Sequence, residues 1–210
     1  MIDRHWLHQR LQGFPRKPIP HAGLRRAAVL VPLFSRDDED HLLFTVRTAH
    51  LNHHAGEISF PGGGQDDGDT DLWATALREA EEELGIDSER VVLHGRLDDF
   101  YSIHGYHVTP FVATIPAPHQ LKIDHFEIEE VFTAPLEQLR DPAIHHVEDW
   151  VHKGRDLLVD FYDYQRYRIW GLTGAILRQL LEETVDAPCG AGWTGGHARQ
   201  PACVHRGVRS

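Results

Sequence analysis

Cysteine is scarce in this sequence. The 210 residues include two cysteines, Cys189 and Cys203, and both lie near the C-terminal end. The rest of the chain therefore needs no disulfide, which fits a reducing cytoplasm. No run of about 18 or more apolar residues is present. The N-terminal stretch "MIDRHWLHQRLQGF" lacks the apolar core of a secretory signal. We therefore expect a cytoplasmic protein without a membrane partner.

Positive charge is also in short supply. The chain has 21 Lys and Arg against 32 Asp and Glu, so its formal net charge is −11. This balance argues against a general nucleic-acid-binding surface. It does not exclude an anionic substrate, because clustered carboxylates can hold a divalent metal that supplies the positive charge. The 17 histidines show no zinc-type spacing, so we interpret them as surface and core residues.

The remaining pattern predicts one α/β domain with a core, since 41% of the residues are hydrophobic. A short polar helix is expected within residues 1–20. Strands and helices alternate irregularly, which indicates an α/β sandwich with a mixed sheet. The predicted strands are 26–34, 41–47, 57–60, 91–97 and 107–115, followed by a hairpin over 156–171 and a helix over 171–183.

These elements suggest three segments: an N-terminal extension (1–24), the domain (25–186) and a tail (187–210). The tail is rich in Gly, Pro, Ala and Arg and lacks periodicity, which predicts disorder. A zinc site in the tail is the alternative, but its spacing matches no known finger pattern. The ligands would be Cys189, His197, Cys203 and His205.

An acidic helix is the most informative feature of the sequence. Between Asp71 and Leu84 the apolar residues follow helical spacing, and Gly85 can end the helix. The predicted core-facing residues are Trp73, Leu77, Ala80 and Leu84. At 100° per residue, three carboxylates fall on another side, within about 100° of one another, whereas Glu81 turns away. The three are Glu79, Glu82 and Glu83.

A solvated acidic face is the simplest interpretation of these three glutamates. However, like charges at i, i+4 repel, and no lysine nearby relieves them. They also lie in the last turns, where the helix dipole favours cations. Carboxylate oxygens are the ligands that Mg²⁺ prefers. Three glycines, Gly62, Gly63 and Gly64, precede the helix and would let the backbone approach a ligand closely.

At these residues the sequence resembles the Nudix family. The stretch "REAEEELGI" (78–86) fits the end of the Nudix box, R-E-U-x-E-E-x-G-U, at every position. The resemblance implies hydrolysis of a nucleoside diphosphate linked to another group, with Mg²⁺ or Mn²⁺ held by Glu79, Glu82 and Glu83. It also implies that Arg78 holds the loop through an upstream acid. The box places a glutamate eight residues before the arginine, where this chain has Thr70; Asp69 could substitute.

A second resemblance concerns "LLFTVRTAHLNHHAGEISFPGG" (42–63), which looks like the segment before the box in coenzyme A pyrophosphatases. Thr45, Arg47, Gly56 and the run 60–63 match in register, whereas Asn52 stands where that pattern has an arginine. The resemblance covers about residues 25–183. It implies that coenzyme A or its acyl derivatives are cleaved to 3',5'-ADP and 4'-phosphopantetheine species.

The expected mechanism follows from a metal-bound water that attacks phosphorus. Glu82 is our first candidate for the proton acceptor, and Glu127 or Glu130 is the second. Arg47 is the candidate anion contact, although it could be an ordinary strand arginine. The substrate-binding candidates also include the three glycines. Tyr101, His104 and Tyr106 could line the pocket or form an ordinary aromatic loop.

Two other interpretations remain open. The chain could be a Nudix hydrolase for ADP-ribose, NADH or a dinucleoside polyphosphate, and Asn52 is the main reason to consider this. It could also be a non-catalytic Nudix-fold binding module, although that reading predicts loss of metal ligands and all three glutamates are present. A small nucleotide is the expected partner in each case, and the enzyme is expected to be a monomer or a homodimer.

Overall fold

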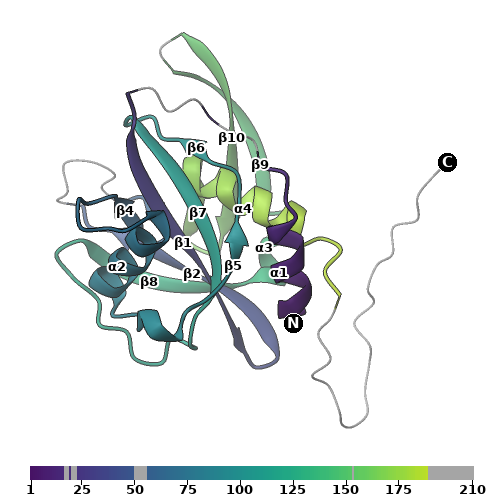
Figure 1. Cartoon of the computed structure of the whole chain (residues 1–210). Helices are drawn as coiled ribbons and strands as arrows, with labels where there is room; N and C mark the ends of the chain where they lie inside the picture. The colour runs from purple at the N-terminus through teal and green to yellow at the C-terminus, as the bar shows by residue number, and fades with distance from the viewer. Residues whose placement is uncertain (17–18, 20–22, 50–55, 153, 189–210) are drawn as a thin grey trace.

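The computed structural model describes residues 1–16, 19, 23–49, 56–152 and 154–188 (Figure 1). Asn52 lies outside the described residues, as do the predicted tail from residue 189 onward and the zinc candidates within it. No helix in the described ranges combines the length and the apolar character that a membrane span requires.

A mixed sheet forms the centre of the molecule. Its main strand order is β3-β2-β1-β7-β5, with β4 paired to β1, β6 to β7 and β8 to β2. The β1–β7 pair is parallel and the other pairs are antiparallel, which confirms the predicted mixed sheet. The strands are β1 (Arg25–Arg36), β2 (Glu39–Arg47), β3 (Ile58–Ser59), β4 (Gly62–Gly64), β5 (Val92–Arg96), β6 (Phe100–Tyr101), β7 (Tyr106–Thr114) and β8 (Ile128–Pro135).

Alternating side chains of this sheet build a hydrophobic core on each face. On β1, Leu30 faces one core and Val31 faces the other, as the two-residue period of a strand requires. Helix α2 (Leu72–Leu84) covers the first face, and α1 (Arg4–Gln12) and α4 (Gly171–Glu183) cover the second (Figure 1). The result is an α/β/α sandwich, as predicted.

Helix α1 is more than a polar extension. Its Leu7 and Leu11 are buried in the core that α4 shares. A Cβ on Gly95 of β5 would lie 2.5 Å from the Leu11 Cβ, so the glycine permits this close packing. The division at residues 24 and 186 stays a prediction, but the first segment contributes to the fold.

A second, antiparallel sheet has the order β11-β10-β9. The predicted hairpin is confirmed, and its turn places Gln165 at a positive φ of 54°. Strands β4, β6, β8 and β9 were not predicted as strands. The remaining elements are β9 (His145–His152), β10 (Arg155–Tyr164), β11 (Tyr167–Trp170), a 3-10 turn (Ser88–Arg90) and α3 (Leu136–Leu139).

Helix α2 starts and ends as predicted, but its buried face differs. The Asp71 side chain accepts a hydrogen bond from the Ala74 N–H, and Gly85 ends the helix in the left-handed conformation. The buried residues are Leu72, Thr75, Ala76, Ala80, Glu83 and Leu84. Trp73 is partly buried and packs against the core that α2 covers, as predicted, whereas Leu77 is partly buried and is not part of it, so the predicted role of Leu77 as an anchor is wrong. The reason is that the sheet contacts a neighbouring stripe of the helix, which includes Glu83.

Candidate active site

The three glycines of β4 bring the backbone directly against α2. They pair with Ala27, Ala28 and Val29 of β1. A Cβ on Gly63 would lie 2.5 Å from Glu79 Oε1, a separation at which the carboxylate would have to move. A Cβ on Gly62, whose φ is +153°, would lie 2.3 Å from the Ala28 carbonyl oxygen. Glycine at these two positions therefore leaves the space that the Glu79 carboxylate and the β1 backbone occupy.

Arg78 ties the loop before α2 to the helix. Its Nε lies 3.0 Å from Asp69 Oδ1, and its Nη2 donates to Asp69 Oδ2 at 3.1 Å and to the Gly64 carbonyl at 3.0 Å. Asp69 also accepts from the Asp66 N–H and from Thr75 Oγ1. These hydrogen bonds, with that of Arg78 the strongest, lower the pKa of Asp69 to about 2. Asp69, which directly precedes Thr70, is thus an acidic partner of Arg78.

Glu83 is buried, with 4% of its surface exposed. Its Oε2 accepts from the Gly62 N–H at 3.3 Å, and its Oε1 lies 3.4 Å from Arg47 Nη1. Burial raises the pKa of Glu83 to about 8; Arg47 opposes this rise, and the Glu79 charge adds to it. The carboxylate would therefore gain from a further cation.

Arg47 lies between two carboxylates instead of at an open entrance. Its second terminal nitrogen is 3.2 Å from Glu127 Oε2, and its side chain is only 20% exposed. Glu127 directly precedes β8, whose pairing with β2 brings it beside Arg47. Glu130, the other acid considered outside the box, is instead bonded to Arg166 and Tyr167. The structure therefore brings Glu127, and not Glu130, to the Glu83 side chain.

The carboxylates form an electrostatically coupled group. Burial raises the pKa of Glu79, and the charges of Glu82 and Glu127 add to the rise against the opposing effect of Arg78. The Glu79 and Glu82 carboxylates both contact Arg78 Nη1, at 3.0 and 2.9 Å. Glu82 differs from the other two helix glutamates because its side chain is 60% exposed.

These donors fit a hard divalent cation by their chemistry. All are carboxylate oxygens, which Mg²⁺ and Mn²⁺ prefer. Burial raises the pKa of Glu83, so a cation bound beside it would stabilise its charged form. Among the described residues, no three acidic, His or Cys side chains converge closely enough to enclose a metal as they stand. Glu79 and Glu82 are turned toward Arg78, and Glu83 toward Arg47.

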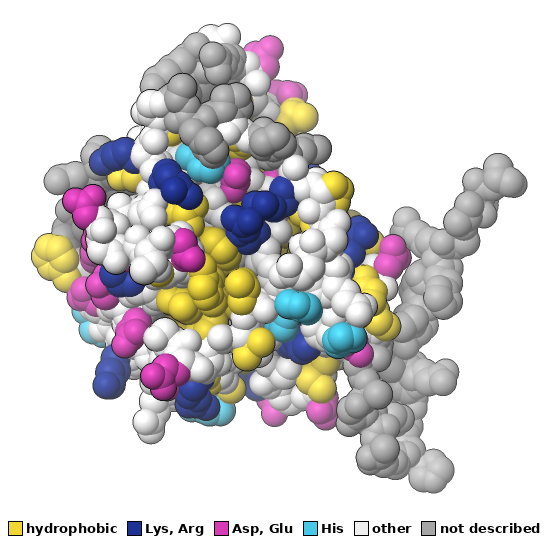
Figure 2. Space-filling view, viewed as in Figure 1, with side chains coloured by type: hydrophobic (Ala, Val, Ile, Leu, Met, Phe, Trp, Pro, Cys, Tyr) yellow, Lys and Arg dark blue, Asp and Glu magenta, His cyan; other side chains and the backbone are white. Residues whose placement is uncertain are grey.

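The face in Figure 2 carries basic and acidic side chains close together around a hydrophobic patch.

Sequence reasoning missed two arginines, Arg25 and Arg26, which line a pocket beside the glycines. Two adjacent arginines at the start of a strand are typical of a surface, so the sequence carried no signal for them. Tyr106 lines the same pocket, whereas Tyr101 and His104 are not among its lining residues.

Comparison with known proteins agrees with this geometry. The NUDIX domain model matches residues 24–154. An uncharacterized Nudix hydrolase NudL of Photorhabdus laumondii is 40% identical over 159 residues, which cover 76% of this chain and 84% of that protein. The NudL of Escherichia coli O6:H1 is 41% identical over 156 residues, covering 74% and 81%.

Among solved structures, a MutT/nudix family protein from Enterococcus faecalis matches with a TM-score of 0.50 and 20% identity, covering 87% of this chain and 68% of that chain. This likeness supports the fold. The family match covers both the glycine strand and α2, and with them all the carboxylates described above. The chain therefore belongs to the NUDIX domain family and is a Nudix hydrolase of pyrophosphate bonds.

Proposed function

We propose that the enzyme hydrolyses the pyrophosphate bond of coenzyme A or its acyl derivatives. The products would be 3',5'-ADP and 4'-phosphopantetheine or its acyl form. The main support is the position of Arg47, which belongs to the segment that resembles coenzyme A pyrophosphatases. Its guanidinium contacts both Glu83 of the Nudix helix and Glu127, so this segment is part of the carboxylate site.

Glu79, Glu82 and Glu83 would hold Mg²⁺ or Mn²⁺ in this proposal. A bound divalent ion would neutralise pyrophosphate charge and lower the pKa of a bound water. Arg78 would hold β4 and α2 in position relative to each other through its hydrogen bonds to Asp69 and to the Gly64 carbonyl. Gly62 and Gly63 would keep the backbone close to the Glu83 and Glu79 carboxylates, beside which the phosphates would bind.

Glu82 is the proposed proton acceptor for the attacking water. It is the most exposed of the three glutamates, so water reaches its carboxylate. Glu127 is the alternative acceptor, because it is the acid from outside the helix that lies on the Glu83 side of the site. Because Glu82 would also hold metal, Glu127→Gln is the deciding variant: a large loss of kcat on coenzyme A with little change in KM would favour Glu127, and a retained kcat would favour Glu82.

The substrate is tested by incubating the purified protein with Mg²⁺ or Mn²⁺ and a panel of pyrophosphates. The panel contains coenzyme A, acetyl-coenzyme A, ADP-ribose, NADH and a dinucleoside polyphosphate, and products are separated by ion-exchange chromatography. Release of 3',5'-ADP supports the proposal. Cleavage of ADP-ribose or of the dinucleotides alone would overturn it and favour the broader Nudix specificity. Absence of any cleavage would favour a binding module.

A further inference from the structure

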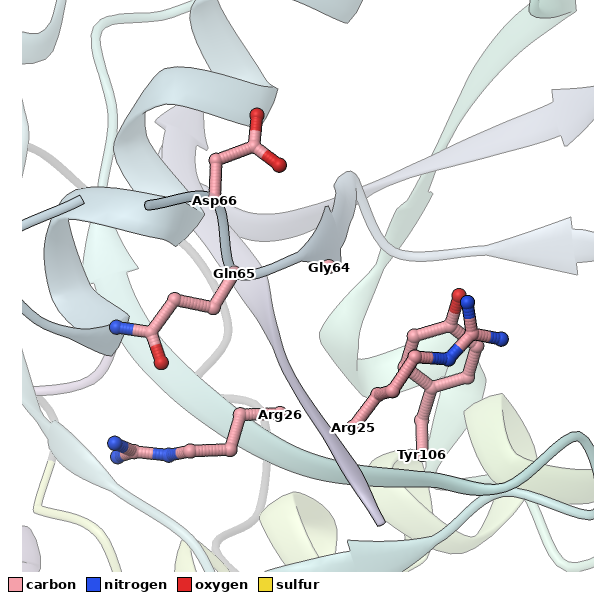
Figure 3. Close-up of a pocket in the computed structure, with 6 residues that line it drawn as sticks. All are labelled: Arg25, Arg26, Gly64, Gln65, Asp66 and Tyr106. Atoms are coloured by element: carbon pink, nitrogen blue, oxygen red, sulfur yellow. The ribbon is translucent and has the colours of Figure 1, made fainter. Parts of the chain in front are cut away.

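A pocket of about 330 Å³ lies beside the glycine strand β4. Its walls come from the start of β1, the start of β7 and the loop that leaves β4 (Figure 3). The residues that line it are Arg25, Arg26, Gly64, Gln65, Asp66 and Tyr106.

This pocket adjoins the candidate active site through Gly64. The Gly64 carbonyl accepts a hydrogen bond from Arg78, while a Cβ on Gly64 would lie 3.7 Å from Tyr106 Cε1. The preceding residue, Gly63, faces the Glu79 carboxylate. Adjacent Cα atoms are about 3.8 Å apart. Gly64 at the pocket wall is therefore the next residue along β4 from Gly63, which faces the candidate site.

Arg25 and Arg26 carry the positive charge of the pocket. Within the described ranges, neither Arg25 nor Arg26 forms an ion pair, unlike Arg47 and Arg78. The Arg25 guanidinium carbon lies 4.3 Å from the centroid of the Tyr106 ring, and the two side chains lie together in Figure 3. This contact restrains the arginine and leaves its N–H donors available.

The acidic member of the pocket does not cancel this charge. The Asp66 carboxylate is 3.8 Å from Arg78 and its side chain is 75% exposed. In Figure 3 it points away from the Arg25–Tyr106 pair, whereas Arg26 and Gln65 extend together on the other side of the strand. The Arg25 side of the pocket is therefore positive in a protein whose net charge is −11.

We propose that this pocket binds a phosphate monoester on the ribose of the substrate, with Arg25, held over Tyr106, as its main ligand. The inference rests on the proposed function, because coenzyme A carries such a group at its ribose 3' position. Arginine binds phosphate oxygens through two parallel N–H donors. Only the ribose separates this group from the pyrophosphate, which suits a pocket whose wall residue Gly64 follows the glycine beside Glu79.

The test compares substrate pairs that differ by this one phosphate. The pairs are coenzyme A with dephospho-coenzyme A, for a 3'-phosphate, and NADPH with NADH, for a 2'-phosphate. We expect kcat/KM to be higher for the phosphorylated member by about tenfold or more, the effect of one charge-assisted contact. In Arg25→Ala this preference should fall toward one, through a higher KM for the phosphorylated member. Arg25→Lys should keep part of it.

Arg90→Ala is the matched control, because it removes one exposed arginine from the 3-10 turn (Ser88–Arg90), away from the pocket. It should keep the wild-type preference. An unchanged preference in Arg25→Ala, or no preference in the wild type for either pair, would overturn the inference while leaving coenzyme A hydrolysis intact.

A direct binding measurement keeps the inference testable if the proposed function fails. Calorimetry without catalysis would compare adenosine 3',5'-bisphosphate with AMP. If coenzyme A is not cleaved, tighter binding of the bisphosphate that is lost in Arg25→Ala would still support the pocket. Equal binding of the two nucleotides would overturn it.

Discussion

Glu83 on α2 and Asp160 on β10 are both buried carboxylates, 4% and 6% exposed, yet their neighbours differ. The two oxygens of Asp160 each have a basic partner, His145 Nε2 at 2.9 Å and Arg178 Nε at 3.1 Å. Glu83 shares one arginine with Glu127 and is repelled by Glu79. The first arrangement is balanced and serves structure, whereas the second is short of positive charge and suits the binding of a cation.

The largest expected effect comes from Glu83→Gln. Glutamine keeps the shape but removes the charge, so hydrolysis with Mg²⁺ or Mn²⁺ should fall by more than about 100-fold, beyond the effect of losing an outer-shell partner. The free energy of unfolding should not fall along with the activity. Because burial raises the pKa of Glu83 from 4.5 to about 8, its ionised form destabilises the metal-free fold progressively as pH rises through this window.

The measurement for Glu83→Gln therefore has two parts. Steady-state hydrolysis gives the loss of activity, and thermal unfolding at pH 8 without metal gives the stability. We expect an inactive variant whose unfolding temperature equals or exceeds that of the wild type. Retained activity would exclude Glu83 as an essential ligand, and a strongly destabilised variant would contradict the charge imbalance described here.

Gly63→Ala tests whether Glu79 needs the space beside it. The new Cβ would lie 2.5 Å from Glu79 Oε1, so the carboxylate must turn away. We expect a loss of about 10–100-fold in metal affinity or activity, comparable to losing a group that orients a ligand. The Mn²⁺ concentration for half-maximal activity measures this.

Gly68→Ala is the control for that substitution. A Cβ there would meet nothing within 4 Å, and both changes reduce the freedom of the unfolded chain in the same way. The control should keep wild-type metal dependence. Equal losses in the two variants would show that the loop before α2, and not the Glu79 position, accounts for the effect.

Asp69→Asn tests the hydrogen bonds between Arg78 and Asp69 in the loop before α2. Since Asp69 acts on the site only by holding Arg78, we expect a loss of about tenfold in kcat. The pKa of Asp69 falls from 3.8 to about 2 on folding, so its ionised form stabilises the fold above about pH 4. This contribution is lost as pH falls toward 2. Denaturant unfolding between pH 2 and 5 should therefore depend less steeply on pH in the variant. If the unfolding free energy of the variant depended on pH as steeply as that of the wild type, the contact of Asp69 with Arg78 would not stabilise the fold.

The sequence predicted the elements whose pattern is local. Helices α2 and α4 and strands β1, β2 and β7 have clear periodicity, and each was predicted close to its observed bounds. Strands β8 and β9 were missed, because glutamates and histidines interrupt their apolar pattern and only pairing with β2 and β10 makes them strands. Propensity in such strands depends on cross-strand neighbours that a linear reading cannot see.

The candidate site was predictable where residues lie on one helix. The spacing of Glu79, Glu82 and Glu83 predicted that they lie on one side of α2. It could not predict how deeply each is buried, because burial depends on where the sheet contacts the helix. The contact of Arg47 with Glu83 joins residues 36 positions apart and needs the β2 register. For the same reason, the pocket at Arg25 could not be predicted.

Asp160→Ala is expected to have no effect on catalysis, which makes it the counterpart of Glu83→Gln. It leaves His145 and Arg178 without their shared acceptor, and unfolding free energy should fall by about 2 kcal/mol, the usual cost of unpaired polar groups near a core. Denaturant unfolding measures the loss, and kcat/KM of the folded variant should match the wild type. A variant that keeps its stability but loses activity would place β10 in the site. It would also remove the distinction between balanced and unbalanced carboxylates, because a carboxylate with a basic partner on each oxygen would then serve catalysis as well.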